Sequence, residues 1–149
     1  MARKPERDVR ADLAGDRRVS LSIPLKPEYA AICRLAVAGL ANLHRLDQET
    51  VGDLKVAVTE ACSFFIRPRG GDDVGWQAVA PEVCLDFDVA DDTWAIEVSV
   101  AAGTASPELL SGLNPEAELG LSVIRALLDS VDVETAPDGR MALKLVKQV

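Results

Sequence analysis

The segment DLKVAVTEACSFFI, residues 53–66, is mostly apolar after its first turn yet carries an acidic residue, Glu60, near its middle. Its apolar residues recur at helical spacing, which predicts a helix over about residues 48–66. Asp47 stands where a side chain would cap the start of that helix. Phe64 follows Glu60 by one turn, so the two side chains share a helix face. The predicted buried stripe consists of Leu54, Val58, Ala61 and Phe65.

Strand patterns and two further helix patterns surround this helix. Alternating apolar and polar residues between turn formers predict strands at 19–25, 82–90, 93–102, 131–135 and 141–149. The other helices are expected over about 28–44, with Pro27 near the first turn, and 118–131, with Leu121, Ile124 and Leu128 inward. Loops are expected at 67–75 and 103–118. This order predicts an α+β two-layer sandwich, in which three helices cover one face of a mostly antiparallel mixed sheet.

Length and charge exclude several classes of protein. The 149 residues suit one domain, and the net charge of −8 argues against binding nucleic acid through phosphate neutralisation. No apolar run is long enough to span a membrane, and the N-terminus lacks an apolar signal core. Residues 1–18 hold six basic and four acidic residues, which predicts a flexible arm or one ordered by a partner. A cytoplasmic location follows as the expectation, with 19–149 as the single domain.

The first helix is predicted to bury one stripe and to expose a face of small residues. Spacing assigns the buried stripe to Tyr29, Ile32, Ala36, Leu40 and Leu43. Arg34 then points away from it, flanked by Ala30, Ala38 and Ala41. Such a flat face permits close approach by another protein, although an ordinary solvated face has the same pattern.

Several segments resemble the anti-sigma-factor serine kinases of Gram-positive bacteria, the RsbW and SpoIIAB type within the GHKL (HATPase_c) superfamily. They are IPLKPEY, ICRLAVAGLA, DLKVAVTEAC and ELGLSVIRALLDSV, and the resemblance covers about residues 19–149. It implies the fold of histidine-kinase-type ATPases, which agrees with the predicted sandwich.

The resemblance also implies roles for two residues of the second helix. In the family, a glutamate acts as general base toward a serine, and an asparagine four residues later helps to hold Mg²⁺ against ATP. Glu60 matches the glutamate, but Phe64 stands at the asparagine position. A phenyl ring offers no oxygen to a hard cation. Glu60 is then interpreted as a remnant, which a link to Arg67 could stabilise.

Two more nucleotide motifs of the family are altered. The Asp-x-Gly that receives adenine corresponds to Ala101-Ala102-Gly103, which lacks the carboxylate. The Gly-x-Gly-Leu that cradles phosphate corresponds to Glu118-Leu119-Gly120-Leu121, where an acid replaces the first glycine and would repel phosphate. With three elements changed, we expect no cofactor and no metal, and ATP with Mg²⁺ only if kinase activity persists.

The resemblance further implies protein partners: an RNA polymerase sigma factor, a competing STAS-type anti-anti-sigma protein and a second copy of the chain. Arg34 matches a family arginine at the shared contact surface, and its guanidinium suits a carboxylate partner. The acidic chain would suit the basic faces of a sigma factor.

Three hypotheses follow. The chain is a degenerate anti-sigma factor acting by sequestration, an active serine-protein kinase, or a ligand-sensing or scaffolding module on the same fold. The three cysteines, at 33, 62 and 84, have no zinc-like spacing and an odd count, which predicts reduced thiols. Cys33, next to Arg34, is either an inert thiol or a sensor of oxidants.

Overall fold

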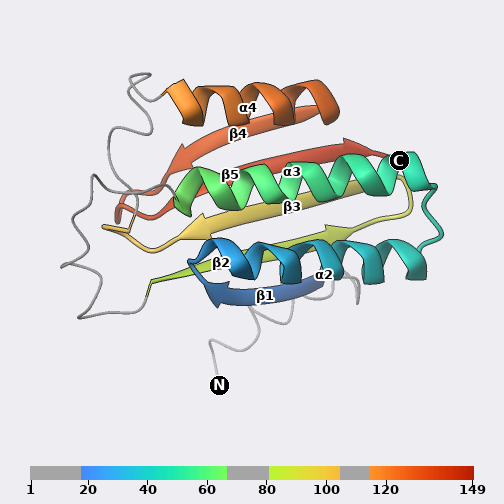
Figure 1. Cartoon of the computed structure of the whole chain (residues 1–149), viewed down its shortest axis with the longest axis horizontal. Helices are drawn as coiled ribbons and strands as arrows, with labels where there is room; N and C mark the ends of the chain where they lie inside the picture. Colours follow the sequence, from blue (N-terminus) through green and yellow to red (C-terminus); the bar gives the residue numbers. More distant parts are fainter. Residues whose placement is uncertain (1–17, 67–80, 105–114) are drawn as a thin grey trace, which may run out of the picture.

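The computed structural model describes residues 18–66, 81–104 and 115–149 of the chain. Figure 1 shows three helices lying across one face of a sheet. The strands are β1 (Arg18–Pro24), β2 (Glu82–Val89), β3 (Thr93–Val100), β4 (Ser130–Thr135) and β5 (Met141–Gln148). The helices are α2 (Ala30–Leu43), α3 (Gln48–Ile66) and α4 (Pro115–Leu127), and a short 3₁₀ turn, η2 (Pro27–Tyr29), precedes α2. The predicted two-layer sandwich is confirmed.

The five described strands form one sheet in the order β1-β2-β3-β5-β4, and every neighbouring pair is antiparallel. β1 lies at an edge, as its flanking prolines predict. The register places Leu85 of β2 opposite Leu21 on one side and Val98 on the other. Apolar side chains of neighbouring strands therefore line up in rows across the sheet.

The alternating strand pattern sends apolar side chains toward the helices. In β2, Val83, Leu85, Phe87 and Val89 are buried, whereas the residues between them stay partly exposed. The predicted inward residues of α3 and α4 are buried against this face: Leu54, Val58, Ala61, Phe65, Leu121, Ile124 and Leu128. The core thus lies between the two layers, and burial of its apolar surface is the main stabilising term.

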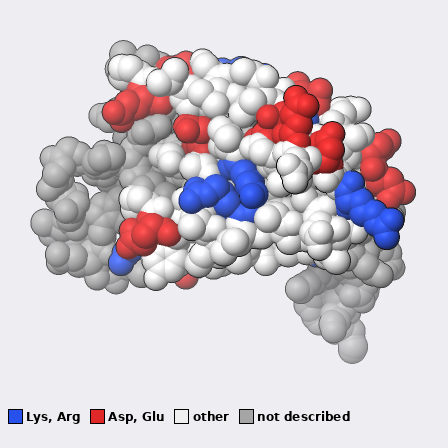
Figure 2. All heavy atoms as spheres, turned by 45° about the vertical axis from the view of Figure 1, so that its right-hand side comes forward, with Lys and Arg blue, Asp and Glu red and all other residues white. Residues whose placement is uncertain are grey.

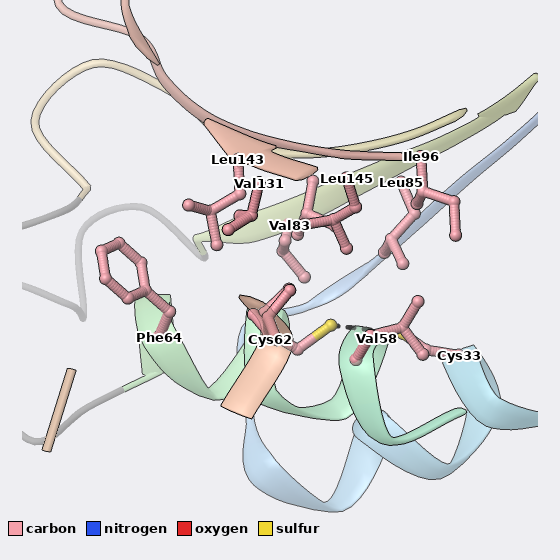
Figure 3. Close-up of a cluster of buried hydrophobic side chains, with 14 of the residues drawn as sticks. Cys33, Val58, Cys62, Phe64, Val83, Leu85, Ile96, Val131, Leu143 and Leu145 are labelled. Carbon is pink, nitrogen blue, oxygen red and sulfur yellow. Dashed lines mark hydrogen bonds between the residues drawn. The ribbon is translucent and has the colours of Figure 1, made fainter. Parts of the chain in front are cut away.

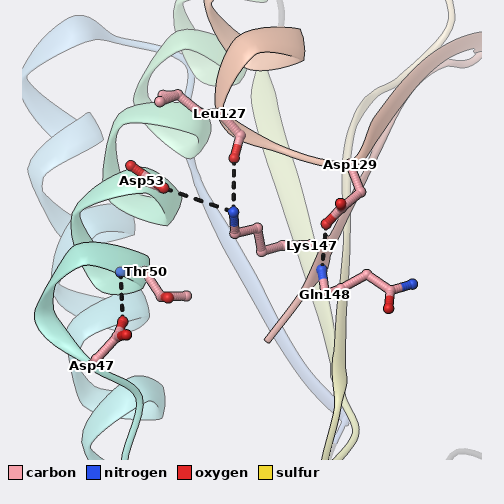
Figure 4. A network of polar contacts seen from close by, with 7 residues as sticks. All are labelled: Asp47, Thr50, Asp53, Leu127, Asp129, Lys147 and Gln148. Carbon is pink, nitrogen blue, oxygen red and sulfur yellow. Dashed lines mark hydrogen bonds and ion pairs between the residues drawn. The ribbon is translucent and has the colours of Figure 1, made fainter.

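The start of α3 is fixed by the cap that the sequence predicts. Asp47 Oδ1 accepts a 2.8 Å hydrogen bond from the backbone N–H of Thr50, which satisfies a donor left free at the helix start (Figure 4). The side-chain and backbone groups of Thr50 hold the pKa of Asp47 below its usual value. Arg45, in the connection from α2, has a φ of 57° and so turns the chain back sharply.

The buried stripe of α2 differs from the predicted one. The structure buries Ala30, Cys33, Val37 and Ala41, whereas the predicted inward residues Ile32 and Leu43 are 40% and 74% exposed. Helix α2 is apolar on nearly every side, so periodicity could not choose its inner face. Small residues occupy that face, which permits close packing of the helix on its neighbours.

Helix α4 begins three residues earlier than predicted, at Pro115 rather than Glu118. Proline suits a first helical position, because its missing N–H would have no partner there. The predicted loop at 67–75, the arm at 1–17 and most of the loop at 103–118 lie outside the described residues.

One lysine of β5 joins helices α3 and α4 to the sheet, at the end of the molecule opposite the start of α4. Lys147 Nζ donates to the carbonyl of Leu127 at 3.0 Å and lies 3.7 Å from Asp53 Oδ2 (Figure 4). Asp129 Oδ2 accepts from the backbone N–H of Gln148 at 2.6 Å. The ammonium therefore lies at the negative end of α4, where a cation is stabilising.

Within the described ranges, no helix is both long and apolar enough to cross a lipid bilayer.

Candidate functional site

The three altered motifs come together at one end of the molecule. Figure 1 shows the C-terminal end of α3, the end of β3 and the start of α4 on the same side. Helix α3 carries Glu60 and Phe64, β3 leads into Gly103, and α4 carries Glu118 and Gly120. Three segments that are separate in sequence thus lie at one end of the molecule and form the candidate nucleotide site.

Phe64 is part of the core at this end. Its side chain is 1% exposed and meets the ring of Phe65 edge-on, with centroids 5.1 Å apart. Figure 3 shows the ring directed toward the sheet, together with the core residues around Cys62. Edge-to-face packing of this kind adds to the burial of two large rings. The position that the resemblance assigns to a metal ligand is thus filled by buried hydrocarbon.

Glu60 lies one turn earlier on α3 and is half-buried. Among the described residues, its carboxylate has neither a hydrogen-bond donor nor a cation as partner. The expected link to Arg67 falls outside the described residues. Its role as a remnant base stays a prediction.

The turn after β3 has the backbone that its glycine predicts. Gly103 has a φ of +83°, and the N–H of Thr104 donates to the carbonyl of Ala101 at 3.1 Å. Ala101 and Ala102 are exposed. A Cβ at Gly139, in the turn between β4 and β5, would lie 3.1 Å from the Ala102 Cβ. The two turns therefore pack together, and no carboxylate occurs in residues 101–104.

The Glu118–Leu121 segment lies inside α4 rather than ahead of it. Only the first four N–H groups of a helix lack an intrahelical partner, and Gly120 is the sixth residue of α4. Its amide is therefore committed to the helix and is not free to cradle a phosphate. Glu116 and Glu118 place two carboxylates in the first turn. Within the described ranges, no group of three or more His, Cys, Asp or Glu side chains could hold a metal ion.

Arg34 faces α3, in contrast to the solvent-facing orientation predicted for it. Its Nη1 donates a 3.1 Å hydrogen bond to Thr59 Oγ1, which in turn donates to the carbonyl of Lys55 at 2.8 Å. The guanidinium is thus held at the edge between the two helices and stays half-buried. Its remaining N–H groups lie at a fixed place on the helical surface, where an acidic group of a partner could bind them.

The exposure predicted for two of the contact residues is wrong. Ala30 is 7% exposed and Ala41 is 2% exposed, because both lie on the inner face of α2. Ala38 is half-buried. Neither Ala30 nor Ala41 can therefore touch a partner while the helix is packed.

The residues that α2 does expose differ from those that the sequence predicts. Ile32, Leu35 and Leu43 are 40%, 70% and 74% exposed, and Val56 of α3 is 43% exposed. We call these four residues the outer apolar face. Figure 2 shows small basic groups separated by broad uncharged surface, with acidic groups beyond them. The sequence gives no signal for this face, because α2 is apolar on nearly every side. Only the structure shows that these large apolar side chains are exposed.

Two of the cysteines lie side by side in the structure, which their spacing in the sequence did not predict. Cys33 of α2 and Cys62 of α3 are both fully buried, with their Sγ atoms 3.6 Å apart (Figure 3). The hydrogen bond from Cys62 lowers the pKa of Cys33, and the charge of Arg34 acts in the same direction against the effect of burial. The same hydrogen bond, together with burial, raises the pKa of Cys62.

The fold, with three motif-bearing segments gathered at one end, defines a GHKL-type ATPase domain. The family model for the histidine kinase-like ATPase domain matches residues 23–147. The chain belongs to this family and, within it, to the RsbW type. It is 30% identical to the serine-protein kinases RsbW of Bacillus cereus (strain AH187), Bacillus anthracis (strain A0248) and Bacillus thuringiensis (strain Al Hakam). Each alignment covers 89% of this chain and 85% of the relative.

Proposed function

We propose that this protein is an anti-sigma factor that sequesters an RNA polymerase sigma factor and is countered by a STAS-type anti-anti-sigma protein. We further propose that it acts without ATP. The observation that carries the second part is Phe64, a buried phenyl ring at the position of the metal-binding asparagine. Similarity to RsbW over most of the chain supports the first part.

The residues at the candidate site fit magnesium and a nucleotide poorly. Mg²⁺ requires oxygen ligands in near-octahedral geometry, and Phe64 supplies none. The amide of Gly120 is used within α4, and the carboxylates of Glu116 and Glu118 repel phosphate at the helix start. The turn at Ala101 offers no acceptor to the adenine amino group. Each change removes a different contact to ATP.

The exposed surface of α2 and α3 supports protein binding as the function. Arg34 is anchored beside the outer apolar face, so a charged donor and exposed hydrocarbon lie on the same two helices. Interfaces commonly combine an apolar centre with an arginine, since a planar guanidinium can bond a carboxylate through two parallel hydrogen bonds. We propose this surface in place of the small-residue face predicted from the sequence.

The test of the partner is direct binding of the purified protein to the sigma factors and STAS proteins of its host. We expect one sigma factor to bind, and Arg34→Ala to weaken that binding by about 10-fold or more, as loss of a charge-assisted hydrogen bond implies. Arg125→Ala is the matched control, because Arg125 is an exposed arginine on α4. Absence of any sigma-factor complex with the wild-type protein would contradict the anti-sigma proposal.

An active serine-protein kinase is the second candidate, favoured by the relatives, which are named serine-protein kinases, and by the presence of Glu60. Thermal denaturation with Mg²⁺-ATP separates the two. A ligand at 100 times its Kd stabilises a protein by about 2.7 kcal/mol, which would raise the Tm by several degrees. We expect no shift; a saturable shift, with phosphate transfer to a STAS protein, would establish the kinase instead.

A further inference from the structure

Cys33 and Cys62 come from two different helices and meet in the dry core. Neither has solvent exposure, and their Sγ atoms approach to 3.6 Å. A disulfide bond is about 2.05 Å long, so the two sulfur atoms must move only about 1.5 Å closer to bond. Small rotations of two unbranched side chains can supply this, since α2 and α3 already pack against each other.

We propose that Cys33 and Cys62 are a modification site, at which hydrogen peroxide forms a reversible disulfide that cross-links α2 to α3. Peroxide is the chemical class of oxidant that suits the site, because it is close to water in size and the site is closed to bulkier disulfides. The third thiol, Cys84, is partly exposed on β2 and lies by Ser22, so it is not a member of the pair.

The reaction balances in two steps. The Cys33 thiolate attacks one oxygen of the peroxide, the O–O bond breaks, and Cys33 becomes a sulfenic acid with release of water after protonation. Cys62 then attacks the Cys33 sulfur, and the sulfenic oxygen leaves as a second water that carries the proton of Cys62. Two thiols are oxidised, one peroxide is reduced and two waters form. The steps are written with Cys33 as the attacking thiol; either sulfur can donate in the bond between them, and the same two waters form if Cys62 attacks first.

The position of the pair would connect oxidation to the functional surface. Cys33 directly precedes Arg34, and Cys62 lies between Glu60 and Phe64 on α3. A cross-link would hold together the two helices that bear these residues. An effect on partner binding rests on the proposed function, whereas formation of the cross-link does not.

The test is oxidation of the folded, full-length Cys84→Ser protein with graded hydrogen peroxide. Remaining thiols are then alkylated in denaturant and mapped by mass spectrometry. We expect the intact chain to lose the mass of two hydrogen atoms and to yield one linked peptide pair joining positions 33 and 62. Dithiothreitol should restore both thiols. In Cys62→Ala, with no second thiol in reach, Cys33 should give a sulfenic acid that dimedone traps when the oxidised chain is unfolded in its presence.

The wild-type chain provides a check that needs no substitution. Unfolded in urea, it should form all three possible pairings of its cysteines, whereas the folded chain should form only the 33–62 pair. The proposal is overturned if Cys33 and Cys62 remain free at a peroxide dose that fully oxidises the unfolded chain. It is equally overturned if the folded chain links either of them to Cys84.

Discussion

Phe64 combines a structural role and a functional consequence in one side chain. Its ring is 1% exposed and packs edge-on against Phe65, so it contributes to the core at the end where α3, β3 and α4 meet. The same ring stands at the position that the resemblance assigns to a metal ligand. A change to asparagine would therefore remove packing before it could add a ligand, because we propose that the other nucleotide contacts are also lost.

We expect Phe64→Asn to lower the free energy of unfolding by about 3–5 kcal/mol, as a large-to-small core change that also buries an amide. Ser63→Asn, at the adjacent half-buried position, is the control and should change stability by less than about 1 kcal/mol. Urea denaturation measures both. Neither variant should gain a Tm shift with Mg²⁺-ATP; a shift in Phe64→Asn would mean that one residue alone had disabled the site.

At the scale of an element, α2 shows how a helix can be apolar on both sides and still pack in one way. Most of its inner face is made of small residues, whereas Leu35 and Leu43 point outward. Exposed leucines cost solubility without stabilising the fold, which is understandable if a partner covers them. Residues of the outer apolar face can therefore be changed without disturbing the core, whereas residues of the inner face cannot.

Leu35→Asp tests whether the outer apolar face binds the partner. Leu35 is 70% exposed, so the fold should keep its Tm within about 2 °C, as expected for a surface change. Sigma-factor affinity should fall by about 10-fold or more, because a carboxylate would be desolvated in an apolar contact. Leu119→Asp is the matched control, with a leucine 66% exposed on α4. Equal affinities for the two variants, measured by calorimetry, would remove the outer apolar face from the interface.

The contact that joins α3, α4 and β5 belongs to the same scale. Lys147 reaches the carbonyl of Leu127, the last residue of α4, and the carboxylate of Asp53, with 20% of its side chain exposed. Lys144, on the same strand, pairs with Glu134 at 3.4 Å, but its side chain is 48% exposed. Solvent screens the second pair more strongly.

We expect Lys147→Met to destabilise the protein by about 1–2 kcal/mol, through loss of a charge-assisted bond at a helix end. Lys144→Met should cost about 0.5 kcal/mol or less, as an exposed ion pair implies. Denaturant midpoints compared at unchanged m-value give the difference. Identical midpoints would mean that Lys147 is not a significant tie between the layers.

At the scale of the whole molecule, the sheet has one covered and one polar face. Across the polar face, Asp86 lies opposite Glu97, and Glu97 lies opposite Lys144 on β5. This face can remain solvated, so the helical layer is the side on which apolar surface is left to bury. The homodimer that the resemblance implies stays a prediction.

The proposed loss of ATP binding predicts how the whole molecule responds to nucleotide. A ligand changes an equilibrium only through a difference in affinity between its two states. We therefore expect Mg²⁺-ATP to leave the Kd for the sigma factor unchanged, and release to depend on the concentration of the STAS protein. Titration of the sigma-factor complex with and without nucleotide measures this. A change of about 10-fold in Kd would show that the site still couples nucleotide to partner.

Local chemistry explains which predictions from the sequence were correct. Every described strand and helix was expected in its order, because alternation, helical spacing and the Asp47 cap each act over a few neighbouring residues. The start of α4 was misplaced because Pro115 is a loop former in most contexts but also suits a first helical position. The altered motifs at Phe64 and Glu118 were visible because they are substitutions in a recognisable pattern.

By itself, the sequence determined the elements and the two-layer class, since these follow from local order along the chain. The residues that the resemblance assigns to nucleotide positions stay a prediction. Only the tertiary structure decided which side of α2 is inside, that Arg34 is held by Thr59, and that Cys33 meets Cys62. The physical reason is that α2 is apolar on both sides, so its orientation depends on the shapes of α3 and the sheet. Those surfaces form only when residues 25 or more positions apart are packed together.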